Sequence, residues 1–148
     1  MKPEIKSVIC SPLTDNEFKN YYALRWQILR APWKQGKGSE KDEFEESSIH
    51  RMAVLCNEII ACGRLHFIDQ QTAQIRYMAV ADAFKNSGIG RSILISLEEA
   101  ARDNKIKTIV LDSREIAVNF YEKHGYQVLE KSHLLFNEIQ HYKMLKNI

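Results

Sequence analysis

A glycine-containing turn between an apolar strand and a helical segment is the part of this sequence best suited to binding chemistry. Its residues are Lys85, Asn86, Ser87, Gly88, Ile89, Gly90, Arg91 and Ser92. The first N–H groups of a helix lack intrahelical partners and lie at the positive end of its dipole. Glycines leave those amides open to an anion, and Lys85 and Arg91 add positive charge. The turn predicts a phosphate or pyrophosphate site; the alternative is a turn that only tightens strand-to-helix packing.

The spacing of this turn excludes two common phosphate-binding loops. A nucleotide-triphosphatase loop needs a lysine after its last glycine, whereas Arg91 follows Gly90 and no glycine lies five residues earlier. A dinucleotide-binding fingerprint needs a third glycine at position 93, which is Ile93. A nucleotide-binding or nucleic-acid-binding domain is therefore disfavoured.

Two motifs in this order resemble those of the GNAT superfamily of N-acetyltransferases. Met78-Ala79-Val80 and the turn from Lys85 to Gly90 resemble the superfamily's apolar-Ala-Val strand and its Arg/Gln-x-x-Gly-x-Gly/Ala signature, with Lys85 replacing Arg or Gln. Residues 117–126 match Ala-x-x-Phe-Tyr-x-x-x-Gly-Phe/Tyr. The ending Ile139-x-His141-x-x-Met144 also looks like that of the ElaA-like branch.

The resemblance implies a fold and an activity. The expected fold is a single α/β domain over residues 1–148, with a mixed, mostly antiparallel sheet of about seven strands and about four helices. A parallel strand pair should splay apart at the cofactor site. The implied reaction transfers an acetyl group from acetyl-CoA to a primary amine of a small molecule or peptide, by direct attack in a ternary complex. The alternative is a non-catalytic acyl-CoA-binding or regulatory module of the same fold.

The resemblance also assigns roles to particular residues. The backbone of Met78, Ala79 and Val80 should hold the pantetheine arm, and the amides of residues 85–91, with Ser92, should hold the pyrophosphate. The N–H of Met78 would polarise the thioester carbonyl, and Tyr121 would protonate the departing thiolate. Without the motif, Tyr121 would be read as a packed core tyrosine.

The base that deprotonates the amine and the shape of the acceptor pocket stay open. The candidate bases are His50, His66, Glu43, Glu46 and His141, and a water relay is an alternative. Arg114 replaces an asparagine usual in the family, and either reaches a phosphate or is solvated. The acidic stretch Glu40 to Glu46 either attracts a cationic amine or is a solvated loop. Trp33 and Phe44 either line an apolar wall or anchor that loop.

The elements that must position these residues follow from periodicity and turn signals. We expect first a strand over Ile5–Cys10, then a helix capped by Thr14 or Asp15 and ended by Ala31-Pro32, and a loop over 33–48. A hairpin over 52–65 that turns at Asn57-Glu58, a strand over Thr72–Val80 and a helix from Ile89 to Asp103 should follow. The chain should end with a buried strand over Ile106–Leu111, a helix opened by an Asp112/Glu115 capping box and ending at His124, and strands over about 126–136 and 139–145.

Composition narrows the class of protein. The chain has 148 residues, 45% hydrophobic and 27% charged, with a net charge of +2, which suits one globular domain and gives no reason to expect nucleic-acid binding. Cys10, Cys56 and Cys62 lack metal-ligand or disulfide spacing, so we expect free thiols and no metal. Met1 to Val8 lacks the apolar core of a signal peptide, and no apolar run is long enough to span a bilayer. We expect a cytoplasmic protein, with a homodimer as one compatible assembly.

Overall fold

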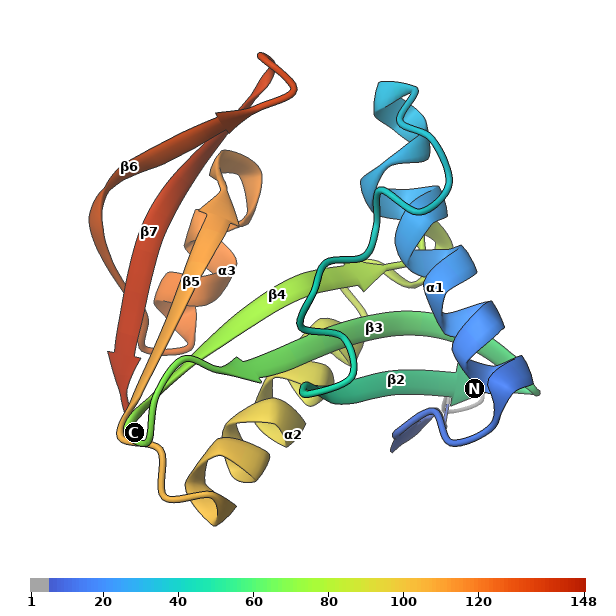
Figure 1. Ribbon diagram of the computed structural model, residues 1–148, viewed down its shortest axis with the longest axis horizontal. Helices are drawn as coiled ribbons and strands as arrows, with labels where there is room; N and C mark the ends of the chain where they lie inside the picture. The colour runs from blue at the N-terminus through green and yellow to red at the C-terminus, as the bar shows by residue number, and fades with distance from the viewer. Residues whose placement is uncertain (1–5) are drawn as a thin grey trace, which may run out of the picture.

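Seven strands pair into one mixed sheet in the computed structural model, which describes residues 6–148 (Figure 1). The strand order is β1-β2-β3-β4-β5-β7-β6, and of these neighbours only β4 and β5 run parallel. The expected α/β fold with a mixed, mostly antiparallel sheet is confirmed. In place of about four helices, the described residues form three α-helices and three short 3-10 helices.

The elements have the following bounds: β1 (Val8–Cys10), α1 (Asp15–Leu29), η1 (Ala31–Trp33), β2 (Ile49–Leu55), β3 (Glu58–Phe67), β4 (Thr72–Val80), η2 (Asp82–Phe84), α2 (Ile89–Asp103), β5 (Thr108–Arg114), η3 (Glu115–Ala117), α3 (Val118–Lys123), β6 (Gln127–Leu135) and β7 (Ile139–Asn147). Ile5, the expected first residue of the first strand, lies outside the described residues, as does Met1 to Glu4 of the segment expected not to be a signal peptide.

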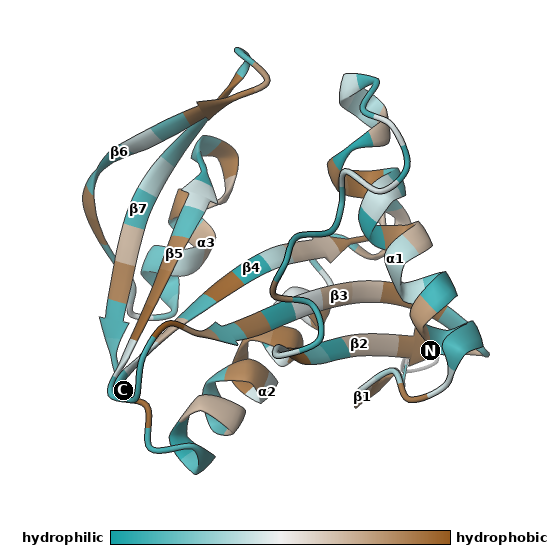
Figure 2. Cartoon of the chain, in the orientation of Figure 1, coloured by the Kyte–Doolittle hydropathy of each residue, from teal (hydrophilic) through white to brown (hydrophobic). Residues whose placement is uncertain are grey.

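Helices cover both faces of the sheet. On one face, α1 contributes Tyr21 and Leu29 to a cluster that contains Cys62, Tyr77 and Ala79 of the strands. On the other face, α2 buries one side of its amphipathic surface, including Ile93, Leu94 and Leu97, against a second cluster. Figure 2 shows the hydrophobic and hydrophilic residues that alternate around α2. Burial on two faces fixes the sheet between two layers.

The parallel pair separates along its length. Strands β4 and β5 are in register only from Thr72 to Ile75 on β4 and from Thr108 to Leu111 on β5. Beyond this point β4 continues against β3 and β5 continues against β7. Figure 1 shows the two strands diverging from their shared start. The expected splayed strand pair is confirmed.

A β-bulge changes the direction of the side chains where β4 leaves β5. Cys62 of β3 lies opposite Ala79, whereas Arg64 lies opposite Arg76, so β4 holds one extra residue. Tyr77 in this bulge has a φ of 58°. Its ring packs in the α1-side cluster, and the next residue, Met78, packs against the α2-side cluster. Neither Tyr77 nor Met78 has a register partner in β3 or β5.

The strand beside the bulge needs a glycine. A Cβ added to Gly63 would lie 2.6 Å from the Met78 sulfur and 2.7 Å from Cγ2 of Ile93. Both distances are shorter than van der Waals contact allows, so a larger residue would displace Met78 or α2. Gly63 therefore allows α2 and the bulge to approach β3 closely.

Two local predictions were wrong. The β2–β3 hairpin turns at Cys56 and Asn57, which have φ values of 49° and 64°, one residue earlier than expected. Asp112 does not cap a helix, because β5 continues through Arg114 and pairs with β7, where Asp112 lies opposite Lys143. The helix instead begins at Val118 after the 3-10 turn η3.

The structure also bears on membrane spans, thiols and metal ligands within the described residues. From residue 6 onward, no helix has both the length and the apolar character required to cross a bilayer. Cys10, Cys56 and Cys62 are free thiols. Within the same residues, no group of three or more His, Cys, Asp or Glu side chains is placed to hold a metal ion.

Candidate functional site

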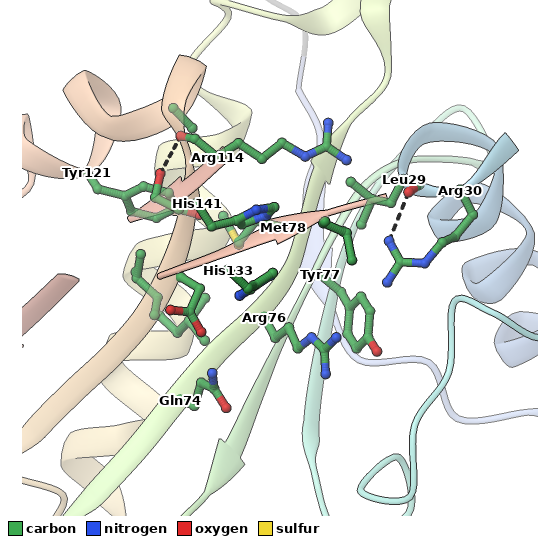
Figure 3. A pocket seen from close by; sticks show the side chains of 16 residues that line it. Leu29, Arg30, Gln74, Arg76, Tyr77, Met78, Arg114, Tyr121, His133 and His141 are labelled. Carbon is green, nitrogen blue, oxygen red and sulfur yellow. Dashed lines mark hydrogen bonds between the residues drawn. The ribbon is translucent and has the colours of Figure 1, made fainter. Parts of the chain in front are cut away.

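The divergence of β4 from β5 forms a cavity of about 290 Å³ (Figure 3). Its walls come from the end of α1, from β4 and β5, from η3 and α3, and from β6 and β7. It is lined by Leu29, Arg30, Gln74, Ile75, Arg76, Tyr77, Met78, Leu111, Asp112, Ser113, Arg114, Ala117, Tyr121, His133, Leu135 and His141. The cavity thus joins the predicted residues Met78, Tyr121, Arg114 and His141.

Tyr121 lies in this cavity with its hydroxyl unengaged. The side chain comes from α3 and is 7% exposed. Its ring packs edge-on against Phe120 and Tyr126, with centroids 5.0 and 5.7 Å away. The Tyr121 hydroxyl makes no hydrogen bond to any residue from 6 to 148, whereas the Tyr126 hydroxyl donates to Glu98 at 3.0 Å. Burial raises the pKa of Tyr121, against an opposing effect of Arg114, so the phenol keeps its proton near neutral pH.

His141 lies in the cavity with one ring nitrogen engaged by the backbone. It lies directly across from Arg114 in the β5–β7 ladder, on the same face of the sheet. Its Nδ1 is 3.0 Å from the Ile139 carbonyl oxygen, which can only accept, so Nδ1 carries the proton and Nε2 the lone pair. The ring also stacks on His133, with centroids 4.3 Å apart. Burial lowers the pKa of His141, as do the neighbouring His133 and Arg114, so the ring is uncharged near neutral pH.

The other four candidate bases do not line the cavity. Both ring nitrogens of His50 are engaged, Nδ1 with the Tyr21 hydroxyl at 2.9 Å and Nε2 with the Glu45 carbonyl at 2.7 Å. The ring of His66 stacks on Phe44, with centroids 4.2 Å apart. Glu43 and Glu46 are exposed. Only His141, among the five candidates, lies beside Tyr121.

The acidic stretch is part of a buried ionic network rather than a solvated loop. Arg25 and Arg64 are each 0% exposed. Glu45 binds both of them at 2.8 Å, and Asp42 binds Arg64 with both carboxylate oxygens, at 2.6 and 2.9 Å. Buried arginines require such partners, so these two acids are engaged within the protein. Phe44 anchors the loop on His66, and Trp33 lies under the Arg114 guanidinium at 4.6 Å.

The glycine turn presents a series of open amides. Asn86 and Gly88 are left-handed, with φ values of 60° and 87°, and Gly88 is the N-cap of α2, which has no side-chain cap. The N–H groups of residues 86–91 have no hydrogen-bond partner within the described chain. A Cβ added at Gly88 would meet nothing within 4 Å. This geometry leaves an anion free access to the N-terminus of α2.

The side chains of the turn contribute less than expected. Lys85 pairs with Asp82 at 2.9 Å on the surface, and the N–H of Lys85 is taken by the Asp82 carbonyl. The Ser87 hydroxyl donates to the Phe84 carbonyl, and the Ser92 hydroxyl donates to the Gly88 carbonyl at 3.1 Å. Ile89 is buried and Arg91 is exposed. The turn offers mainly backbone groups.

The cavity residues that were not anticipated from the sequence include Arg30, Arg76, Tyr77 and His133. Arg76 and Tyr77 line the cavity because of the bulge, whose position depends on pairing with β3. Arg30 follows the last residue of α1, which approaches β4 only in the folded structure. For His133 the sequence offered only a weak indication, namely its place on the predicted strand next to the strand of His141.

Comparison with known proteins places the chain in a family. The Acetyltransferase (GNAT) family profile matches residues 18–126. The chain is 27% identical over 143 residues to YjcF of Bacillus subtilis, an uncharacterized N-acetyltransferase, covering 97% of this chain and 100% of YjcF. Its fold is similar to a GNAT family acetyltransferase from Elizabethkingia anophelis with acetyl-CoA bound (TM-score 0.79, 21% identity, 96% and 98% coverage of this chain and of that one). It is also similar to Escherichia coli ElaA (TM-score 0.76, 16% identity, 97% and 100% coverage), a likeness that shows the fold and not the branch. Since the family match covers most of its length, this chain belongs to the GNAT family of acetyltransferases.

Proposed function

We propose that this protein transfers an acetyl group from acetyl-CoA to the primary amine of a small molecule or peptide, by direct attack in a ternary complex. The observation that carries the proposal is the meeting of Tyr121 and His141 in one cavity, at the point where β4 separates from β5. An acid with an unengaged hydroxyl and a base with a free lone pair are the two groups that aminolysis of a thioester uses.

The residues present suit coenzyme A. The unpartnered amides of residues 86–91 fit a diphosphate, since Gly88 leaves the space around them open. The separated edge of β4 from Met78 to Val80 has no strand partner on the β5 side and fits the amide groups of a pantetheine arm. Acetyl-CoA bound along these two features would supply an acetyl thioester.

Three groups of the protein then act in defined positions. The lone pair on Nε2 of His141 takes the proton of the incoming ammonium or amine. The N–H of Met78, which has no register partner because of the bulge, polarises the carbonyl that is attacked. The Tyr121 hydroxyl gives its proton to the departing sulfur. No covalent bond to the protein is required.

Gly90→Glu tests the coenzyme site. We expect the KM for acetyl-CoA to rise about tenfold or more, because a carboxylate beside the open amides repels the diphosphate and covers them. A Cβ at this position lies 3.5 Å from Cγ2 of Val80, an ordinary contact, so the fold should tolerate it. Steady-state kinetics and calorimetry with acetyl-CoA measure the change.

Gly36→Glu is the matched control for this variant. Gly36 is exposed, and a Cβ there meets nothing within 4 Å. The control should keep the parental KM. Unchanged affinity of the Gly90→Glu protein for acetyl-CoA would remove the coenzyme from this turn and the proposed reaction with it.

His141→Asn tests the base through its pH dependence. Because burial lowers the pKa of His141, the acid limb of kcat/KM should fall below the usual histidine value of about 6.5. Activity should rise as pH increases through that limb, since the neutral ring is the active form. In the His141→Asn enzyme, kcat should be about tenfold lower at neutral pH and this limb should be absent. If the His141→Asn enzyme retained the same acid limb, His141 would not be the base, and proton removal would be assigned to water.

A further inference from the structure

Positive charge dominates the wall of the cavity. Its lining residues include Arg30, Arg76 and Arg114, and Asp112 is their only acid. Arg76 already has a carboxylate partner, because it donates to Asp42 at 3.0 Å. Asp112 lies opposite Lys143 in the β5–β7 ladder. Two arginines of the cavity, Arg30 and Arg114, therefore remain whose positive charge has no carboxylate partner in the described part of the chain.

Arg114 has no anionic partner within residues 6–148. Its half-buried guanidinium lies over the ring of Trp33 at 4.6 Å, which fixes the plane of the group. No hydrogen bond or ion pair from its side chain is formed within these residues. Figure 3 shows the Arg114 side chain extending from the Tyr121 side of the cavity toward the side on which Arg30 lies. The stacked ring leaves its N–H donors free to bind a ligand.

Arg30 faces the same space from α1. It is 6% exposed and donates from Nε to the Ser39 carbonyl at 2.9 Å and from Nη1 to the Leu29 carbonyl at 2.8 Å. Its guanidinium lies near the rings of Tyr77 and Phe136 and has no carboxylate partner among the described residues. Burial lowers the pKa of both arginines, and Arg30 contributes to the lowering at Arg114. Two desolvated cations that share a cavity, with no carboxylate from residue 6 onward in contact with either, repel each other.

We propose that Arg114 and Arg30 bind an anionic group, a carboxylate or a phosphate, carried by the acceptor amine. The proposal rests on the proposed function, because the amine must reach the thioester beside Tyr121. Planar guanidinium groups bind such anions through paired hydrogen bonds. The cavity of about 290 Å³ lies at the small end of ligand sites, which favours an acceptor the size of an amino acid.

The anionic group that we assign to Arg30 and Arg114 is distinct from the diphosphate of the coenzyme. None of the turn residues 85–92 lines this cavity, and the β4 residues that do line it end at Met78. The amides of residues 86–91 lie beyond the end of β4, at the start of α2. The arginines therefore form a second anionic subsite, next to the reacting groups rather than at the coenzyme's phosphates.

The test compares amines in matched pairs by thiol release from acetyl-CoA. Amino acids are assayed against their carboxamides, and phosphoethanolamine against ethanolamine, which separates a carboxylate from a phosphate. We expect kcat/KM to be at least about tenfold higher for the anionic member of one pair. Arg114→Gln should abolish this preference and leave the KM for acetyl-CoA unchanged, whereas Arg114→Lys should retain part of it.

Arg102→Gln, which removes an exposed arginine on α2, is the control and should keep the preference. Equal or lower kcat/KM for the anionic members, or no turnover of any anionic amine by protein that binds acetyl-CoA, overturns the anionic subsite. If the Arg114→Gln enzyme prefers the anionic member as strongly as the parent does, the anion is bound by other residues and the proposal is likewise overturned. Failure to bind acetyl-CoA in calorimetry instead contradicts the proposed function.

Discussion

The Tyr121→Phe enzyme should turn over about a hundredfold more slowly than the parent, within a range of about ten- to a thousandfold. The substitution removes only the hydroxyl, which makes no hydrogen bond within the described residues, so folding loses little. Burial keeps the phenol protonated, and its loss leaves the departing thiolate without an acid. Affinity for acetyl-CoA should stay the same, because the coenzyme is held by backbone groups elsewhere. Single-turnover kinetics and calorimetry separate the two quantities.

Tyr126→Phe is the matched control for this prediction. Tyr126 is 2% exposed and contacts the Tyr121 ring, but its hydroxyl donates to Glu98 outside the cavity. This variant should lose about 1.5–3 kcal/mol of stability with its hydrogen bond to a charged group and keep its turnover. If Tyr121→Phe is as active as the parent, the acid is another group, and complete inactivity of the parent toward amines would favour the non-catalytic acyl-CoA-binding alternative.

The strands and the two long helices could be predicted from local patterns. The apolar alternation of residues 72–80 gave β4 with the observed bounds, and the spacing of Ile89, Ile93, Leu97 and Ala100 gave α2. These elements follow from burial of one face, which a sequence records directly. The prediction that Asp112 caps a helix was wrong, because pairing of β5 with β7 overrode a local capping signal.

The parts that depend on distant contacts could not be predicted. The bulge at Tyr77 arises from a register between β3 and β4 that no local pattern encodes. Arg25 and Arg64 were not expected in the interior, because isolated charges are almost never buried. Their acidic partners belong to the loop over residues 33–48, whose charge pattern alone is typical of a solvated segment.

The candidate site was predictable in outline, since its motifs lie on predicted elements. Tyr121 and Met78, to which the resemblance assigns roles, both line the cavity. The sequence left five candidate bases equal, whereas the register of β5 against β7 places His141 opposite Arg114. The histidine partner, His133, and the arginine partner, Arg30, come from elements whose approach is a property of the folded sheet.

Glu45→Gln should lower the free energy of unfolding by about 3–5 kcal/mol, the range found when one partner of a buried ion pair is removed. Glu45 is the only acid that binds both Arg25 and Arg64 in the described structure, and neither arginine is exposed. The amide keeps the shape but not the charge, so Asp42 would be left as the carboxylate partner of Arg64 and Arg25 would have none. Urea unfolding followed by circular dichroism measures the loss.

Glu46→Gln provides the matched control, since it removes the same charge from the adjacent, exposed residue. Its free energy of unfolding should stay within about 0.5 kcal/mol of the parent. Burial alone would raise the pKa of Asp42, but the hydrogen bonds and the charge of Arg64 outweigh it and lower the pKa below the usual value. Asp42 therefore stays ionised and continues to hold Arg64. Arg25 then keeps only neutral acceptors, among them the Glu40 carbonyl and the Tyr21 hydroxyl, at 3.1 and 2.9 Å. A Glu45→Gln protein as stable as its control would mean that these neutral contacts suffice for a buried guanidinium, and that the acidic loop does not hold α1 against the sheet through its charge.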